Sequence, residues 1–561
     1  MEERRLVLAV ALSLVVVITY TWLFAPATPP PATQPTAPAA AATLAPAAAA
    51  TAQPAPAEAA PGAALAAEAA PAAVADDRER RVEVTAPDYA VAFTNRGARL
   101  VSWKLNRYRD ARGRPEEMVP AQSPTIRPLD LETGDASVDA RLRDGLFMAS
   151  TTSLEVVGDE PQPLHFKLAE GGIEAEKTIL FRAHGLVALT ISVKRNGQAL
   201  PCRLLWGPGI GTATPEERDV RGYTEPTGVV LQAGKVEQFT AAKLPSEGRR
   251  LETVRWAGVQ SLYFAALFVA PQGQAAAEIR KTTLPTTGEE KPIVAAVAAI
   301  DTSGEGPVQL FVGAKEHGQL RKLGHGLERV VQVGDWIGPI VLALMGALRW
   351  VQSHVGNWGW SIVLLTIAIN VAMAPFRHYS IVNGLKMAKI SPEMRVIQER
   401  YRKVPMMDPR RQQMQTEIGA LYARHGMSMS SQMTVGCLPI LLTMPFLWAF
   451  YRLLTVLVDL RGAPFLWIPD LAQKDPLFIT PVLMGVSMFI MQRMTPSAMD
   501  PTQQRVMMLM PLMFAGMFLW APAGLNLYWF TSNLWSLIQQ WVEMTVLRPA
   551  DAKAGRDRKS R

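Results

Sequence analysis

The sequence predicts a membrane protein with six transmembrane α-helices, a β-sandwich domain between the first and second of them, and a helical hairpin after the second. Apolar runs long enough to cross a bilayer occur near the start of the chain and again after residue 336. Between these regions, short runs alternate apolar and polar residues, as half-buried strands do. Basic residues are concentrated in some of the segments between the apolar runs, which assigns those segments to one side of the membrane.

The first apolar run, Leu6–Phe24, follows Arg4 and Arg5 and is about long enough to cross a bilayer. A segment of mostly Ala, Pro and Thr follows it, and such a composition predicts an extended, disordered tether. A cleaved signal peptide is the alternative, because small residues follow the run, but the length of the run favours an uncleaved anchor. We therefore assign residues 1–25 to an anchor and residues 26–77 to a linker.

Residues 78–330 predict an antiparallel β-sandwich. Apolar and polar residues alternate on both sides of Asn95–Gly97, which is typical of a hairpin, and a short helix is expected near Gly318–Leu327. The histidines of this region are not paired at ligand spacing, and no catalytic or nucleotide-binding motif occurs. We expect a binding or scaffold module that is not an enzyme and that holds no metal or cofactor. The only cysteines, Cys202 and Cys437, predict no disulfide framework.

Residues 331–547 predict a helical membrane core, followed by a basic tail at residues 548–561. Residues 337–354 have an apolar face interrupted by polar residues, which is typical of an amphipathic helix at the membrane interface. Five further spans are predicted at about residues 358–376, 433–458, 476–491, 506–520 and 523–543, with a charged hairpin at residues 377–425.

The distribution of charge predicts the topology. Residues 377–425 hold ten basic and four acidic residues, whereas the loop at residues 459–475 holds two basic and three acidic residues. By the positive-inside rule, the hairpin and both termini are cytoplasmic, and the β-sandwich lies on the other side of the membrane. The net charge of +8 then fits an anionic membrane surface better than nucleic acid.

Two breaks divide the hairpin into helical arms, one at Pro392 and one at residues 404–409. Apolar residues follow helical spacing on both arms and predict the seam between them; an adaptable surface for apolar substrate segments is the alternative. These residues are Met387, Ile390, Met394 and Ile397 on the first arm and Met414, Ile418 and Leu421 on the second. The basic outer face is suited to solvent, to anionic lipid, or to a ribosome or nascent chain.

The last predicted span carries a stripe of polar residues. Their separations of 3, 4, 3 and 4 residues place them on one helical face: Asn526, Trp529, Asn533, Ser536 and Gln540. Polar groups within a span are costly unless they face a protein interior or a wet cavity, so this helix is predicted to have a lipid face and a wet face. The alternative is that these groups hydrogen-bond across a packed bundle.

Motifs through the second half occur in the order VGNWGWSIVLLT, MAKISPEMRVIQERY, GCLPILLTMPFLWAFYRLL, DLRGAPFLWIPDL, QKDPLFITPVLMGVSMFIMQRM, DPTQQRVMMLMPLMF and PAGLNLYWFTSNLWSLIQQ. They resemble the YidC/Oxa/Alb family of membrane protein insertases. WAGVQSLYFAALF and LFVGAKE resemble, more weakly, the large periplasmic domain of its Gram-negative members. The resemblance implies a periplasmic β-supersandwich and a five-helix core in the bacterial inner membrane. It also implies a hydrophilic groove that is open to cytoplasm and lipid, and nascent membrane proteins and the Sec translocon as partners.

The same resemblance implies the residues of the groove. They are Thr366 and Asn370 on the second span, Thr443 on the third, and Asn526, Trp529, Asn533 and Ser536 on the last, with Arg377 at the mouth. The family usually carries an Arg five residues before the Pro that ends the second span, and here that position is Asn370.

Two other classes of protein would also have polar residues within spans. A transporter or channel would usually show an internal repeat, and none is seen in the sequence. An intramembrane enzyme needs a catalytic pair, but the predicted spans contain no pair of Asp residues and no His next to a Ser.

Overall fold

The computed structural model describes residues 74–110, 112–120, 126–211, 225–284, 293–304, 306–334, 336–401, 404–405, 408–425, 444–494 and 501–559, and every statement below concerns these residues. The first predicted span and the linker as far as residue 73 lie outside them, as do the first eleven residues of the predicted third span.

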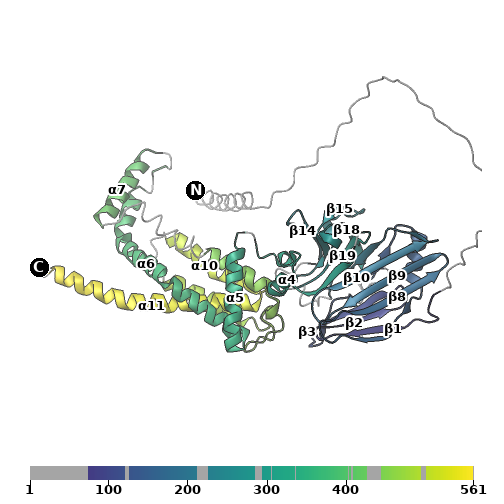
Figure 1. The fold of residues 1–561 in the computed structure, drawn as a ribbon. Coiled ribbons are helices and arrows are strands. Elements are labelled where there is room, and N and C mark those ends of the chain that lie inside the picture. The colour runs from purple at the N-terminus through teal and green to yellow at the C-terminus, as the bar shows by residue number, and fades with distance from the viewer. Residues whose placement is uncertain are drawn as a thin grey trace, which may run out of the picture. The chain divides into compact units, whose positions relative to one another are not determined.

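The β-rich domain contains three sheets (Figure 1). The first has the order β4 (Pro115–Glu117), β3 (Arg99–Arg109), β2 (Tyr89–Thr94), β1 (Arg81–Thr85), β7 (Ser153–Glu155). The second has the order β14 (Lys235–Phe239), β13 (Thr227–Gln232), β16 (Trp256–Gln260), β17 (Phe264–Val269), β20 (Val308–Ala314), β10 (Val187–Arg195), β9 (Ile173–Phe181), β8 (Gln162–Glu170), β6 (Met148–Ala149), with β11 (Gln198–Ala199) beside β10. The third has the order β15 (Arg249–Val254), β18 (Ala275–Leu284), β19 (Ile293–Asp301), β12 (Arg203–Trp206), β5 (Leu131–Glu132).

The strands follow from the alternation in the sequence. The hairpin predicted around Asn95–Gly97 is confirmed, because β2 and β3 pair antiparallel with Val91 opposite Trp103. Strand β9 alternates buried and half-buried residues along its whole length, and its buried face includes Lys177. The Lys177 ammonium donates to the carbonyls of Ala98 at 2.7 Å and Leu129 at 2.8 Å, so the buried donor is satisfied.

Short helices connect the strands and close the domain. They are α2 (Ala136–Asp144), η1 (Ala241–Lys243), η2 (Pro271–Gly273), α4 (His317–Leu323) and η3 (Leu327–Val331). Asp135 caps α2 by accepting from the backbone N–H groups of Ser137 and Val138. The short helix predicted near Gly318–Leu327 corresponds to α4, and η3 follows it.

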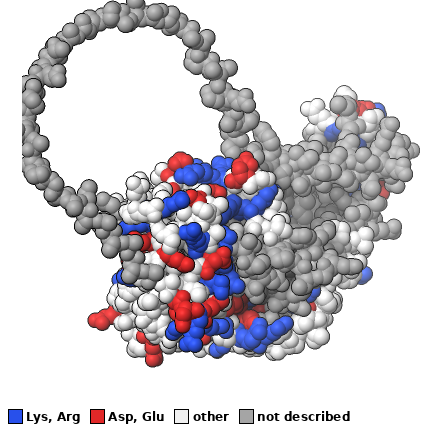
Figure 2. All heavy atoms as spheres, turned by 90° about the vertical axis from the view of Figure 1, so that its right-hand side faces the viewer, with Lys and Arg blue, Asp and Glu red and all other residues white. Residues whose placement is uncertain are grey.

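The outer face of the β-rich domain has a mixed charge. Figure 2 shows acidic and basic side chains interspersed on this face, without a large area of one sign. Among the described residues, this face therefore shows no extended basic surface of the kind that nucleic acid binding requires. Elsewhere in the same domain, opposite charges also pair between neighbouring strands, as in the exposed ion pair of 3.1 Å between Lys167 of β8 and Glu176 of β9.

The second half of the described chain is helical. Its elements are α5 (Gly338–Val355), α6 (Trp358–Arg400), α7 (Arg410–Arg424), η4 (Val458–Leu460), α9 (Ile479–Met494), α10 (Pro501–Phe518) and α11 (Ala523–Lys559). Among the described residues, one stretch is long and apolar enough to cross a membrane, Trp358–Met387 in α6. Met444–Val456, Ile479–Met494 and Met507–Phe518 are shorter apolar helices.

The helix break predicted at Pro392 is wrong, because α6 continues through both Pro375 and Pro392 as far as Arg400. Apolar side chains on both sides of Pro392 pack against α7, and this packing compensates for the lost backbone hydrogen bond, which costs about 3 kcal/mol in a helix interior. The predicted seam between the two arms is confirmed. Its buried residues are Ile390, Met394, Met414, Ile418, Leu421 and Tyr422, with Met387 and Ile397 beside them.

Candidate functional site

Two long helices, α6 and α11, lie against each other and carry most of the polar residues that the sequence singles out (Figure 1). Helix α6 begins where the Asn357 side chain accepts from the Trp360 backbone N–H at 3.1 Å, which caps its first turn. Helix α11 begins at Ala523, directly after Pro522, and also packs against α9. It can therefore present polar side chains to two different neighbours.

One set of polar contacts joins α11 to α6, and we call it the α6–α11 seam. The Ser532 hydroxyl donates to Asn370 Oδ1 at 3.3 Å. The Arg377 guanidinium donates to the Ser536 hydroxyl. Asn370 is almost fully buried, and its amide nitrogen donates to the Thr366 carbonyl one turn earlier at 2.7 Å. The seam thus runs through the interior of the helix pair and ends at a basic residue.

A second set of contacts joins α11 to α9 and α10. Asn526 Nδ2 donates to the Phe518 carbonyl at the end of α10 at 3.2 Å. Asn533 Nδ2 donates to the Ser487 hydroxyl of α9 at 3.1 Å. Trp529 lies edge-on to Phe518, with the two ring centroids 5.0 Å apart. The residues predicted to form one stripe are therefore divided among three neighbours of α11, namely α6, α9 and α10.

The remaining predicted site residues are placed as follows. Thr366 is fully buried, and its hydroxyl donates to the Ile362 carbonyl of its own helix at 2.6 Å. Gln540 is buried near the end of the predicted stripe. Thr443 lies outside the described residues, so its placement in the groove stays a prediction.

Four polar residues of this region are missing from the sequence-based set. Gln539 Nε2 donates to the Ala374 carbonyl at 3.0 Å and to Glu543 Oε1 at 2.8 Å. His378 Nδ1 lies 3.3 Å from Glu543 Oε2 and forms an ion pair with it when the ring is protonated. Ser532 is the fourth. Ser532, Ser536, Gln539 and Glu543 have separations of 4, 3 and 4 residues, so the same helical periodicity could have identified this second stripe.

The charges at the end of the seam are mixed. Arg377 is half-buried, and Glu543 is mostly buried close to His378. Two buried amide oxygens, Asn526 Oδ1 and Gln539 Oε1, accept no hydrogen bond from any residue that the structure describes. Such acceptors are costly unless water or a ligand donates to them. Helix α11 therefore carries two buried acceptors with unused capacity for hydrogen bonding, one beside α10 and one beside α6.

The chain resembles known proteins over nearly all of its length. Residues 350–549 match the family described as 60Kd inner membrane protein, and residues 81–345 match the YidC periplasmic domain. The chain is 31% identical to the membrane protein insertase YidC of Geobacter metallireducens, with 98% of this chain and 100% of that protein covered. Its counterpart in Geobacter sulfurreducens is also 31% identical, with 83% and 86% covered.

The solved structure described as an active YidC insertase with the first transmembrane domain resolved covers 84% of this chain and 93% of its own, at 15% identity and a TM-score of 0.34. The two family models together match residues 81–345 and 350–549, and the similarity to the Geobacter metallireducens protein extends across both regions. The chain belongs to the YidC family of membrane protein insertases.

Proposed function

We propose that this protein inserts and folds nascent integral membrane proteins in the bacterial inner membrane, and that the α6–α11 seam is one wall of a hydrophilic groove used for this. The observation that carries the proposal is the burial of Asn370 and the half-burial of Arg377 between two helices of an apolar bundle. Polar and ionisable groups in such positions usually mark a pathway.

The physical task of an insertase is to lower the cost of moving polar segments into the membrane. An unsatisfied peptide group in hydrocarbon costs several kcal/mol, and short polar flanks contain many such groups. A polar wall supplies temporary hydrogen-bond partners, while the apolar part of the substrate meets lipid directly. This work breaks no bond and consumes no nucleotide, so we assign no catalytic residue, metal or cofactor.

The proposed topology has six spans with both termini in the cytoplasm and the β-rich domain in the periplasm. The excess of basic residues in the hairpin and the tail supports it. We further propose that the protein acts either alone or beside the Sec translocon, in contact with membrane lipids. The basic hairpin and tail are suited to contact with a ribosome during synthesis of the substrate.

Complementation tests this function. A bacterium depleted of its own YidC-family insertase should regain insertion of inner-membrane proteins with short translocated tails when this chain is expressed. Insertion is measured by the access of external protease to the translocated tail. Normal insertion in depleted cells without this chain, or no recovery when blotting shows the chain in the membrane, would contradict the proposal.

Crosslinking tests the location of the groove. A photoreactive amino acid in place of Ser536, which contacts Arg377 in the α6–α11 seam, should crosslink to stalled nascent chains that carry one membrane span. The same amino acid in place of Ile538, a half-exposed position on α11, serves as the matched control. A stronger crosslink from Ile538 than from Ser536 would place the substrate on another face of α11.

A further inference from the structure

The β-rich domain contains a hollow of about 740 Å³ that has no part in the proposed groove. Its lining residues come from five places in the fold, and none belongs to α6 or α11. Arg255 joins β15 to β16, Gln272 lies in η2, Pro307 precedes β20, Gln309 lies in β20, and His325 connects α4 to η3. A hollow of this size lies within the range of small-molecule binding sites, about 300–1,000 Å³.

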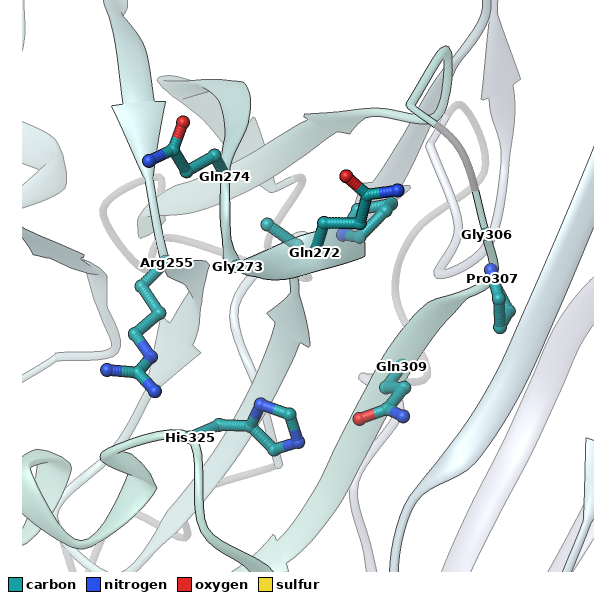
Figure 3. A pocket seen from close by; sticks show the side chains of 10 residues that line it. Arg255, Gln272, Gly273, Gln274, Gly306, Pro307, Gln309 and His325 are labelled. Atoms are coloured by element: carbon teal, nitrogen blue, oxygen red, sulfur yellow. The ribbon is translucent and has the colours of Figure 1, made fainter.

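The polar side chains of the hollow converge. Figure 3 shows the ring of His325 between the guanidinium of Arg255 and the amide of Gln309, below the Gln272–Gly273 turn. Gln309 Oε1 is buried and accepts no hydrogen bond from the part of the chain that the structure describes. Arg255 is exposed at the edge of the hollow, and the described lining residues include no carboxylate. The hollow therefore combines a permanent positive charge with an unused acceptor.

The backbone holds this arrangement in an uncommon conformation. His325 has a φ of 57° between Gly324 and Gly326, whose φ values are 77° and 73°. Gln272, on the other side of the hollow, has a φ of 50°. Residues other than glycine rarely adopt positive φ, and such strain is concentrated at functional sites. Two strained residues therefore face each other across one hollow.

A neighbouring hollow also includes Arg255 and is lined by Glu328 and Arg329. The Arg329 guanidinium donates to the Gly234 carbonyl. Arg255 thus stands between an acid on one side and a hollow without a described acid on the other. An anionic group in the larger hollow would approach Arg255 without passing a described carboxylate.

We propose that this hollow binds the carboxylate of a short peptide segment. Arginine binds carboxylates through paired, charge-assisted hydrogen bonds, so Arg255 supplies the anion partner. The unused Gln309 Oε1 requires a donor, which a lone carboxylate does not offer and a peptide N–H does. A peptide C-terminus presents both groups within one residue, and capture of such a terminus is a known mode of peptide recognition. An Asp or Glu side chain within a peptide offers the same pair of groups.

Fluorescence anisotropy with the purified full chain in lipid nanodiscs tests the proposal without requiring insertion. The probes are a fluorescein-labelled neutral tetrapeptide with a free C-terminus, the same peptide amidated, and an amidated peptide that carries one Glu. The free peptide should bind saturably and the amidated neutral peptide about tenfold more weakly, as the loss of a charged hydrogen bond implies. Binding of the Glu peptide would identify a side chain as a sufficient source of the carboxylate.

Variants assign the binding to the hollow. Arg255→Gln should weaken the free peptide about tenfold, and Gln309→Leu should weaken it severalfold without affecting acetate as a competitor. Arg81→Gln, at an exposed arginine of β1, is the matched control, and circular dichroism checks the fold of each variant. Equal binding by the free and amidated neutral peptides, or equal effects of the two arginine variants, would overturn the proposal. Competition by glucuronate as strong as that by the peptide would overturn the assignment to peptides.

Discussion

At the scale of single residues, the buried Asn370 side chain of α6 accepts a hydrogen bond from the Ser532 hydroxyl of α11. We expect Asn370→Ala and Ser532→Ala to be non-additive, with a coupling of about 1 kcal/mol, because each substitution removes the same hydrogen bond. The coupling is obtained from the thermal unfolding of the wild type, the two single variants and the double variant.

A matched cycle combines Asn370→Ala with Asn526→Ala. Asn526 donates to α10, and among the described residues it shares no hydrogen-bond partner with Asn370, so these two effects should add to within about 0.5 kcal/mol. Strong coupling between Asn370 and Asn526, with none between Asn370 and Ser532, would show that the α6–α11 seam is arranged differently in the membrane.

Lys177 makes the β-rich domain sensitive to pH. Burial lowers the pKa of Lys177 to about 8, so the unfolded chain holds this proton more tightly than the folded chain. Below about pH 8 both states carry the proton; as the pH rises from there toward the ordinary lysine pKa, the folded state gains stability. Lys177→Met should lack this gain.

The measurement is the unfolding temperature of the β-rich domain in wild type and Lys177→Met between pH 7 and pH 9.5. Other groups titrate in both proteins, so the difference between the two curves isolates Lys177. Parallel curves would mean that the Lys177 ammonium keeps its proton throughout this range.

At the scale of secondary-structure elements, α11 is held by α6 on one side and by α9 and α10 on the other. If substrates enter between α6 and α11, fixing this seam should stop insertion. In a chain with Cys202 and Cys437 replaced by Ser, the pair Asn370→Cys and Ser532→Cys, joined by a short bifunctional thiol reagent, should lose most insertion activity.

The control joins α11 to α9 instead, through Ser487→Cys and Asn533→Cys. This crosslink should leave insertion largely intact, because α9 and α11 need not separate. Insertion blocked by the α9 crosslink but not by the α6 crosslink would place the entry site between α9 and α11.

The hairpin depends on the apolar seam between α6 and α7. Leu421 is almost fully buried there, and Leu421→Ala should destabilise the packing of α7 by about 2–4 kcal/mol. Faster amide hydrogen exchange across Arg410–Arg424, with unchanged exchange in α11, is the expected result. Gln413→Ala, on the exposed face of α7, serves as the control and should leave the exchange unchanged.

The hairpin also shows where sequence reasoning succeeds and where it fails. Spacing predicts the seam residues, because packing of a helical face requires that spacing. The continuity of α6 through Pro392 could not be predicted from local preference, because the compensating contacts come from α7. Lys177 is a similar case, since the carbonyls that satisfy it lie about 50 and 80 residues away along the chain.

For the candidate site, too, helical spacing predicts the polar residues of a helix but not the distant residues that they contact. Periodicity identifies Asn526, Asn533 and Ser536 as polar residues of one helix, but it does not assign them to different neighbours. Ser532 is absent from the predicted stripe although its spacing to Ser536, Gln539 and Glu543 could have identified it, but that spacing does not name Asn370 as its partner. Sequence therefore predicts which helices carry polar groups, and the structure assigns the contacts that those groups make.

At the scale of the whole molecule, the topology inferred from the charge distribution can be tested by the accessibility of introduced cysteines. In the chain without native cysteines, Gln198→Cys in the β-rich domain should react with a membrane-impermeant thiol reagent added to cells with permeabilised outer membranes. Gln413→Cys in the hairpin should react only after the inner membrane is opened. Both side chains are exposed in the structure, so each introduced cysteine is accessible to the reagent on its own side of the membrane. The opposite labelling pattern would reverse the proposed orientation.

The two-sided attachment of α11 constrains how this protein can change over evolutionary time. A substitution at Asn370 alters the surroundings of Ser532 and Ser536 but leaves Ser487 and Asn533 untouched. Related chains that carry Arg in place of Asn370 should therefore show linked replacements at the positions of Ser532 or Ser536. The Ser487–Asn533 pair should vary independently of Asn370, so that substitutions on the two sides of α11 should be uncorrelated among related chains.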